Sequence, residues 1–413
     1  MKKIILVCGI ILIVFFGASL VQAGDLTGRF DAYFYGYIKV DAVYMDAKAV
    51  QSNYLILVPP ANAKDANVDY GDDPSFSVTA RQSRFGFKIK GPGFGKEGQI
   101  LGRLEMDFYG KGGAVNEENK GNLELRIATI EFKSPNWSLL VGNDWMVMSP
   151  LYPHVSNYTY GAEMGNLGYR MPQIRLTGYL LDGKLALMAS AGEKIGDAGF
   201  KDIDTGDDAA QPDIQAGICW NSKLNGKPLK VGVTGHYAQE ELGSNLTADN
   251  HEHRVESWSY NFHLSVPITK WLTISGEWFH GANLDGWYTG GVGQGWVETE
   301  DGKYEALKDT GGWAEIGLGP FKGIQIFGGY GVDDVDDDQL EDAVRSNAKD
   351  ATEINDSITK NSMYYASVHY WLVPKVVDIS LEWMQVTTEY GLNDALDDGV
   401  VNRYTLSFWF FFY

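Results

Sequence analysis

Tyr404-Thr405-Leu406-Ser407-Phe408-Trp409-Phe410-Phe411-Phe412-Tyr413 is the stretch of sequence that decides the fold. From Tyr404 to Phe412 the even-numbered residues are aromatic or aliphatic, whereas Arg403, Thr405 and Ser407 between them are polar. A period of two is that of a β-strand, whose successive side chains point to opposite faces. The stretch is too short for a membrane helix. Such a strand needs an apolar solvent for one face and partners for its backbone, and a closed barrel in a bilayer provides both.

The register of this strand stays open at its end. Trp409 to Tyr413 is aromatic on both faces, so the alternation does not choose which set faces lipid there. A local bulge, or an interface that buries both faces, would reconcile the two halves of the segment. We expect the strand to be the last of the barrel and to close it against the first, near residues 32–44.

The N-terminal segment has the pattern of a secretory signal. A basic start, Met1-Lys2-Lys3, precedes an apolar run from Ile4 to Leu20 and the small-residue site Val21-Gln22-Ala23. This order predicts a cleaved signal peptide over residues 1–23 and a single barrel domain over residues 24–413. A retained membrane helix is the alternative, which the small residues at the end of the run disfavour. After Ala23 no apolar run reaches the ~18 residues that a spanning helix needs.

Composition agrees with strands and excludes several classes of protein. The chain has 49 glycines and is 13% aromatic, which suits short strands, tight turns and aromatic girdles. Its net charge of −20 argues against nucleic acid as a partner. Cys219 is the one cysteine after the predicted signal, so no internal disulfide framework is expected. The acidic segments at residues 202–208 and 333–342 are predicted to be solvated loops.

The chain alternates between strand-like segments of about ten residues and two kinds of joint. Seven short joints are rich in turn-forming Gly, Pro and Asn, and eight long joints are polar. This rhythm predicts an all-β fold, a 16-stranded antiparallel transmembrane β-barrel with short periplasmic turns and long extracellular loops. The short joints are residues 91–98, 134–136, 181–184, 221–228, 267–270, 319–323 and 373–375; the long ones are 46–77, 110–122, 145–172, 193–211, 240–254, 281–310, 333–361 and 388–399.

Alternation within the strands assigns their two faces. In residues 99–109, Leu104 and Met106 share one face, and Arg103, Glu105 and Asp107 share the other. A charged side chain facing lipid at mid-bilayer would cost up to about 2–4 kcal/mol. The charged face therefore points to water inside the barrel. Because sixteen strands enclose an aqueous channel, whereas eight are filled by side chains, the sequence indicates a pore.

An ordered set of short blocks resembles the general porin superfamily, and most closely the DcaP-like outer-membrane porins. The resemblance is strongest over residues 35–180, and the second half of the chain matches only through its alternation and terminal aromatic. The blocks are Tyr35-Gly36-Tyr37-Ile38-Lys39-Val40-Asp41, Ser83-Arg84-Phe85-Gly86-Phe87, Leu104-Glu105-Met106-Asp107-Phe108-Tyr109-Gly110, Leu125-Arg126-Ile127-Ala128, Val141-Gly142-Asn143-Asp144-Trp145 and Arg170-Met171-Pro172-Gln173-Ile174-Arg175. It implies a homotrimer in the outer membrane of a Gram-negative bacterium, in contact with lipid and lipopolysaccharide. It also implies that the third loop folds inward and that small anionic, carboxylate-bearing solutes pass.

The candidate constriction joins this third loop to charged residues that the strand alternation places in the lumen. Residues 145–172 hold prolines and aromatics, which suggests packing against the barrel wall. Arginine suits anion selection because its fixed charge and forked donors match a carboxylate. The predicted pore residues are Lys39, Arg84, Arg103, Glu105, Asp107, Arg126, Glu163, Arg170 and Arg175. For each of them, cross-strand pairing that braces the wall is the alternative to solute contact.

Other functions have weaker support in the sequence. A barrel enzyme would need a nucleophile, a base and an orienting group, and no G-x-S-x-G motif occurs. The acidic run near residue 333 lacks the glycine and final glutamate of an EF-hand loop, and His251 and His253 have no evident third ligand. We therefore predict neither a cofactor nor a metal site. A non-selective or cation-preferring porin remains the alternative to an anion-preferring one.

Overall fold

The computed structural model describes residues 30–49, 53–65, 68–69, 71, 73–110, 121–194, 209–242, 251–299, 302–347, 358–392 and 395–412. The predicted signal peptide, the acidic segment 202–208 and Tyr413 lie outside these residues. Within them, no helix is both long enough and apolar enough to cross a membrane.

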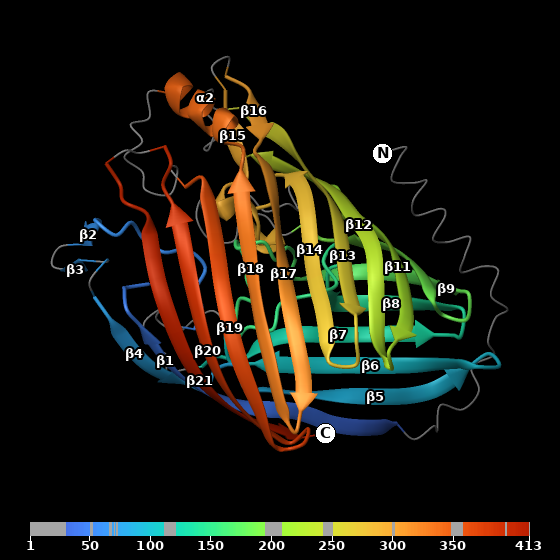
Figure 1. The fold of residues 1–413 in the computed structure, drawn as a ribbon. Helices are drawn as coiled ribbons and strands as arrows, with labels where there is room; N and C mark the ends of the chain where they lie inside the picture. The colour runs from blue at the N-terminus through green and yellow to red at the C-terminus, as the bar shows by residue number, and fades with distance from the viewer. Residues whose placement is uncertain are drawn as a thin grey trace.

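The described chain forms one closed antiparallel barrel, whose strands stand side by side in Figure 1. Neighbours in sequence pair with each other around the ring, and the last strand pairs with the first. The strands are β1 (Asp31–Met45), β4 (Ser75–Thr79), β5 (Arg84–Phe94), β6 (Gly98–Asp107), β7 (Glu124–Lys133), β8 (Trp137–Trp145), β9 (Arg170–Leu180), β10 (Leu185–Gly192), β11 (Asp213–Leu224), β12 (Lys227–Leu242), β13 (His253–Pro267), β14 (Leu272–Ala282), β17 (Lys308–Phe321), β18 (Ile324–Val335), β19 (Lys360–Val373), β20 (Val377–Glu389) and β21 (Gly399–Phe412).

β4 and β5 are two pieces of one strand, which makes sixteen positions and confirms the predicted fold. β5 pairs with β1 from Asp31 to Tyr37, and β4 pairs with it from Asp41 to Met45. The chain between the pieces, residues 80–83, leaves the ladder. The side chain of Ser83 replaces the missing ladder bonds, because its Oγ accepts from Lys39 N at 3.1 Å and donates to Lys39 O at 3.2 Å. Alternation along the sequence does not predict this break.

The two ends of the barrel differ in the segments that connect the strands. The short turns between strands use residues that tolerate positive φ, such as Asn225 (52°) and Gly226 (77°), which match the twist of a tight hairpin. At the other rim the long loops carry further elements: β2 (Lys64–Asp65), β3 (Val68–Asp69), η2 (Gly286–Tyr288), η3 (Gly291–Gly293), β15 (Trp296–Glu298), β16 (Tyr304–Ala306) and α2 (Asp337–Asn347). Figure 1 shows α2 and the β15–β16 hairpin above the strands.

The acidic segment 333–342 is not the solvated loop that the sequence analysis predicted. Asp333 is fully buried within β18, and α2 begins soon after the strand ends. Asp336 accepts a hydrogen bond from Gln339 N at 3.1 Å, and Asp337 and Asp338 occupy the first helical turn. A capping side chain and acids near the positive end of the helix stabilise it, so acidity here favours a helix.

Exposure confirms the two faces of the barrel strands and settles the register of β21. Tyr404, Phe408 and Phe410 are each 49% exposed on the outer face, whereas Arg403 and Ser407 are buried. Each of the residues from Arg403 to Phe412 pairs in unbroken register with β1, so no bulge is needed. The odd-numbered aromatics are held on the opposite face, where Trp409 lies 5.0 Å and Phe411 5.7 Å from the ring of Tyr37.

Candidate pore constriction

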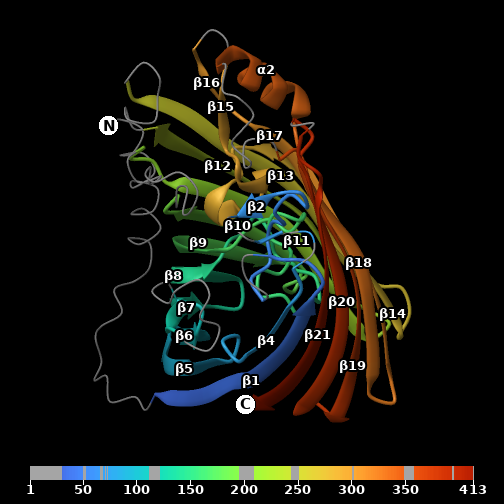
Figure 2. The ribbon, with the colours of Figure 1, turned by 90° about the vertical axis from the view of Figure 1, so that its left-hand side faces the viewer.

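The loop between β8 and β9, residues 146–169, folds into the barrel as predicted, and Figure 2 shows green loop segments inside the ring of strands. Three glutamates on the inner faces of β14, β17 and β20 accept hydrogen bonds from its backbone N–H groups. Buried N–H groups need acceptors, and a carboxylate makes a strong one. The pairs are Leu151 N to Glu277 Oε1 at 2.9 Å, His154 N to Glu315 Oε2 at 2.8 Å and Ser156 N to Glu382 Oε2 at 2.6 Å.

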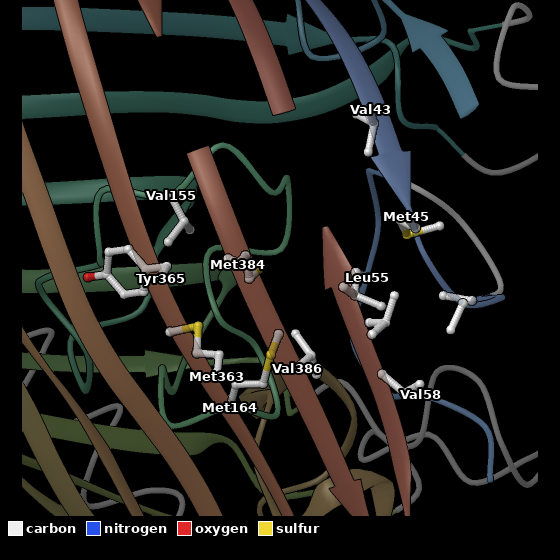
Figure 3. Close-up of a cluster of buried hydrophobic side chains, with 13 residues drawn as sticks. Val43, Met45, Leu55, Val58, Val155, Met164, Met363, Tyr365, Met384 and Val386 are labelled. Atoms are coloured by element: carbon white, nitrogen blue, oxygen red, sulfur yellow. The ribbon is translucent and has the colours of Figure 1, made fainter. Parts of the chain in front are cut away.

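Apolar packing holds the same loop against the same side of the barrel. Figure 3 shows Val155 and Met164 of the loop among Met363, Tyr365 and Met384 of the wall. Gly331 on β18 permits this approach, because a Cβ there would overlap the carbonyl oxygen of Met164. The loop is thus fixed by both polar and apolar contacts to the side of the barrel formed by β14 to β20.

A second loop, residues 283–295, also packs inward and is hydrogen-bonded to the third loop. Glu163 N donates to Thr289 O at 2.8 Å, and Gly168 N donates to Tyr288 O at 2.6 Å. The Glu163 carboxylate accepts from Gly293 N at 2.9 Å and is 7% exposed. Glu163 was predicted as a pore residue, but the structure places it in this contact between loops. Glu163 was predicted from its place in the third loop, and the contacts of that loop with residues 283–295 depend on the tertiary structure.

Opposite the anchored side, charged residues of β5 to β9 form an arginine network. It comprises four guanidinium groups, Arg84, Arg103, Arg126 and Arg170, and three carboxylates, Glu105, Asp107 and Glu124, so its net charge is +1. Its contacts are Arg126 Nη1 to Asp107 at 2.6 Å, Arg126 Nε to Glu105 at 3.3 Å, Arg103 Nη2 to Glu105 at 2.6 Å, Arg84 Nε to Glu105 at 3.7 Å and Arg170 Nη2 to Glu124 at 2.6 Å.

A register shift in β7 places Arg126 at the centre of the arginine network. The pairing between β6 and β7 slips between Glu105 and Met106, so that Leu125 is 53% exposed while Arg126 and the next residue, Ile127, are both buried. A bulge re-aims a side chain in this way. Glu124, which the sequence analysis missed, joins because it lies at the start of the same strand. Glu124 and Arg126 are two residues apart before Ile127, on the face opposite the exposed Leu125.

Two tyrosines of the third loop complete the network. The Tyr158 hydroxyl accepts from Arg126 Nη1 at 2.9 Å and donates to Glu124 Oε2 at 3.0 Å. The Tyr160 hydroxyl accepts from Arg84 Nη2 at 3.3 Å. Burial alone would raise the pKa of Tyr160, but the positive charges of Arg84, Arg126 and Lys39 outweigh it and lower that pKa to about 8.

Lys39 belongs to a different cluster, a wall network formed with Asp41, Glu382 and Arg403. Lys39 Nζ lies 3.1 Å from Asp41 Oδ2, and Arg403 Nη1 lies 3.0 Å from Glu382 Oε1. Asn53 of the first loop donates to Asp41 at 2.8 Å and accepts from Arg403. Lys39 is 0% exposed, and its ammonium donates to Ser156 O of the third loop at 2.8 Å, which favours the wall-bracing alternative for this residue.

The remaining predicted residues differ in their access to solvent. Arg175 pairs with Asp144 at 2.7 Å on the wall, and Asp107, Arg126 and Arg170 are almost completely buried. The Arg103 side chain is 39% exposed, more than the side chain of any other network member. Arg103 is therefore the network residue best placed to meet a solute.

Comparison with known proteins agrees with this geometry. A family model described as "DcaP outer membrane protein" matches residues 26–213. Over these residues the chain is similar to the DcaP outer-membrane proteins. A crystal structure of the DcaP channel of Acinetobacter baumannii is similar to it, with a TM-score of 0.69 at 17% identity over 93% of this chain and 97% of that one.

Two further solved structures share the fold of this chain. An anion-selective porin from Comamonas acidovorans aligns with a TM-score of 0.60 at 9% identity, over 93% of this chain and 100% of that one. OmpF of Salmonella typhi aligns with a TM-score of 0.53 at 12% identity, over 95% and 100%. No curated protein sequence matches the chain. Barrel, family model and neighbours together place the protein in the outer membrane of a Gram-negative bacterium.

Proposed function

We propose that the protein conducts small hydrophilic solutes by passive diffusion and prefers anions, carboxylates in particular. The observation that carries this proposal is the excess positive charge of the arginine network at the third loop. A charge excess in a narrow, partly dehydrated passage biases which ions enter it. The similarity in fold to a porin described as anion-selective supports the same direction.

A cation-preferring porin is the second candidate, because the chain has a net charge of −20. Charge far from the narrowest point acts weakly, however, since salt screens exposed charges beyond about 8 Å at physiological ionic strength. The constriction therefore outweighs the loops in setting selectivity.

Reversal potentials across a planar bilayer, measured under a potassium chloride gradient, test the proposal. We expect the sign of a chloride-preferring pore. Arg103→Gln should move the potential toward zero without closing the channel, whereas Lys90→Gln, an exposed cation outside the network, should move it less. A potassium-preferring potential that Arg103→Gln leaves unchanged would contradict anion selection.

Processing and assembly complete the proposed function. We expect cleavage after Ala23, which N-terminal sequencing of the purified protein tests, with residues 24–413 as one barrel domain. We also expect a homotrimer in contact with lipopolysaccharide; OmpT of Vibrio cholerae, a neighbour with a TM-score of 0.52 at 11% identity, is described in a trimer form. Native mass spectrometry of the detergent-solubilised protein distinguishes three copies from one and detects retained lipid.

A further inference from the structure

Two cations stand opposite each other on neighbouring strands just beyond the third loop. Lys88 on β5 and Arg103 on β6 are directly paired in the antiparallel register. Lys88 alternates with Arg84, and Arg103 with Glu105, so both side chains are on the inner face. Like charges directly opposite each other in a sheet destabilise it, and their placement on a solvated wall calls for a compensating anion.

Lys88 is not neutralised by the described wall, and Arg103 has only a shared carboxylate. Among the described residues no carboxylate lies within ion-pair distance of Lys88, and Lys88 is exposed. Arg103 shares Glu105 with Arg84 and Arg126, so that one carboxylate serves three guanidinium groups. Lys90, two residues along β5 on the same face, differs because Asp31 is its register partner on β1.

Both cations, Lys88 and Arg103, lie against the aromatic ring of Tyr35 on β1. Lys88 Nζ lies 4.7 Å from the ring centroid, and the Arg103 guanidinium lies 5.8 Å from it. Arg103 Nε donates to the Tyr35 hydroxyl at 2.9 Å. Gly86, the register partner of Tyr35, leaves room for this ring, because a Cβ there would lie 3.0 Å from the ring and its hydroxyl. The ring restricts two long side chains that would otherwise lose entropy on binding.

We propose that Lys88, Arg103 and Tyr35 form a binding subsite for the carboxylate group of a permeating solute. The inference rests on the proposed anion preference and assigns it to one place. Arg103 offers planar N–H donors and Lys88 a mobile ammonium, the two kinds of donor that bind carboxylates. The site lies on the periplasmic side of the arginine network, so a solute that passes the third loop meets it next.

The test compares two variants with the same change of charge. Lys88→Gln and Lys90→Gln each remove one exposed cation from the same face of β5. We measure the acetate-to-chloride permeability ratio of the full-length porin in planar bilayers under bi-ionic conditions. A contact between unit charges at about 4 Å in water corresponds to a change of about fivefold. We expect Lys88→Gln to lower the ratio by about three- to fivefold, Lys90→Gln to change it by less than half as much, and Lys88→Arg to retain it.

Each outcome has a defined meaning. Equal reductions in Lys88→Gln and Lys90→Gln, or none in either, would overturn the subsite, because acetate would then respond only to the general field of the lumen. The proposed function is judged separately by the potassium chloride reversal potential of the unmodified porin. A chloride-preferring pore in which the two variants behave alike retains the function and loses the subsite. Folded barrel yield, read from heat-modifiable mobility in gels, controls for misfolding.

Discussion

The wall network and the arginine network are built from the same residue types and have different consequences. In the wall network two cations meet two carboxylates, and all four side chains are at most 1% exposed. In the arginine network four cations meet three carboxylates, and Arg103 is 39% exposed. The wall network, whose charges are balanced and buried, stabilises the barrel wall and the third loop that packs on it. Unbalanced and partly exposed charge remains available to a solute.

The largest expected effect is on stability, from breaking the wall network. Glu382→Ala would leave Arg403 buried without its carboxylate and remove the acceptor of Ser156 N. Removing one partner of a buried ion pair costs about 3–5 kcal/mol. We expect the free energy of unfolding, measured by denaturant titration in detergent micelles, to fall by about this amount.

A double replacement is the control for this prediction. Glu382→Leu combined with Arg403→Leu removes both charges, and apolar replacement of a whole buried pair is often neutral. The double variant should therefore be more stable than Glu382→Ala. If the two variants were equally unstable, the buried charge itself would not be the cause.

The next largest expected effect is on ion selectivity, which should change when a charge is removed from the arginine network but not from the wall network. Lys39→Gln and Arg103→Gln each remove one positive charge, from the wall network and from the arginine network respectively. We expect Arg103→Gln to lower the chloride-to-potassium permeability ratio by about fivefold, the effect of about one kcal/mol at a solvated contact. Lys39→Gln should lower stability and leave the ratio nearly unchanged, because Lys39 is 0% exposed. Equal loss of selectivity in both variants would erase the distinction between the networks.

The pH dependence of selectivity tests the charge count of the arginine network. Tyr160 is neutral below its pKa of about 8 and negative above it, so raising the pH adds one negative charge beside Arg84 and cancels the excess of +1. We expect anion preference to fall between pH 7 and pH 9, with a midpoint near 8, and to stay flat over this range in Tyr160→Phe.

The groups that face Tyr160 define what else could respond. From β1 these are Tyr37 and Lys39, from β5 Arg84, from β7 Arg126 and from the same loop Tyr152. An unchanged pH response in Tyr160→Phe would assign the titration to another of these groups.

The smallest effect is expected at the Arg175–Asp144 pair. This pair is balanced like the wall network but only partly buried, with side chains 19% and 14% exposed. Partial access to water moves its value toward the about 0–1 kcal/mol of exposed ion pairs. Arg175→Gln should therefore change both the free energy of unfolding and the permeability ratio slightly. A loss of several kcal/mol would show that position along the wall, and not burial, sets the value of a pair.

Local patterns predicted which residues face inward, but not which of them a solute can reach. Alternation correctly placed Lys39, Arg103 and Asp107 on the inner face. It did not show that the third loop covers Lys39, whose ammonium donates to Ser156 O at 2.8 Å, because this contact joins residues over a hundred positions apart. Alternation places Glu277 and Glu315 on the inner face, but it does not identify them as anchors of the third loop. The sequence pattern does not indicate which backbone N–H groups they bind.

By itself the sequence determined the barrel, its strand count, its outer face and the place of β21, since these follow from a period of two and from the turn residues between strands. Tertiary structure alone decided where the two interior loops lie, that β7 slips at Arg126 and that the charges divide into a balanced and an unbalanced network. The physical reason is range: alternation is set by neighbouring residues, whereas charge balance depends on which strands and loops the closed barrel brings together.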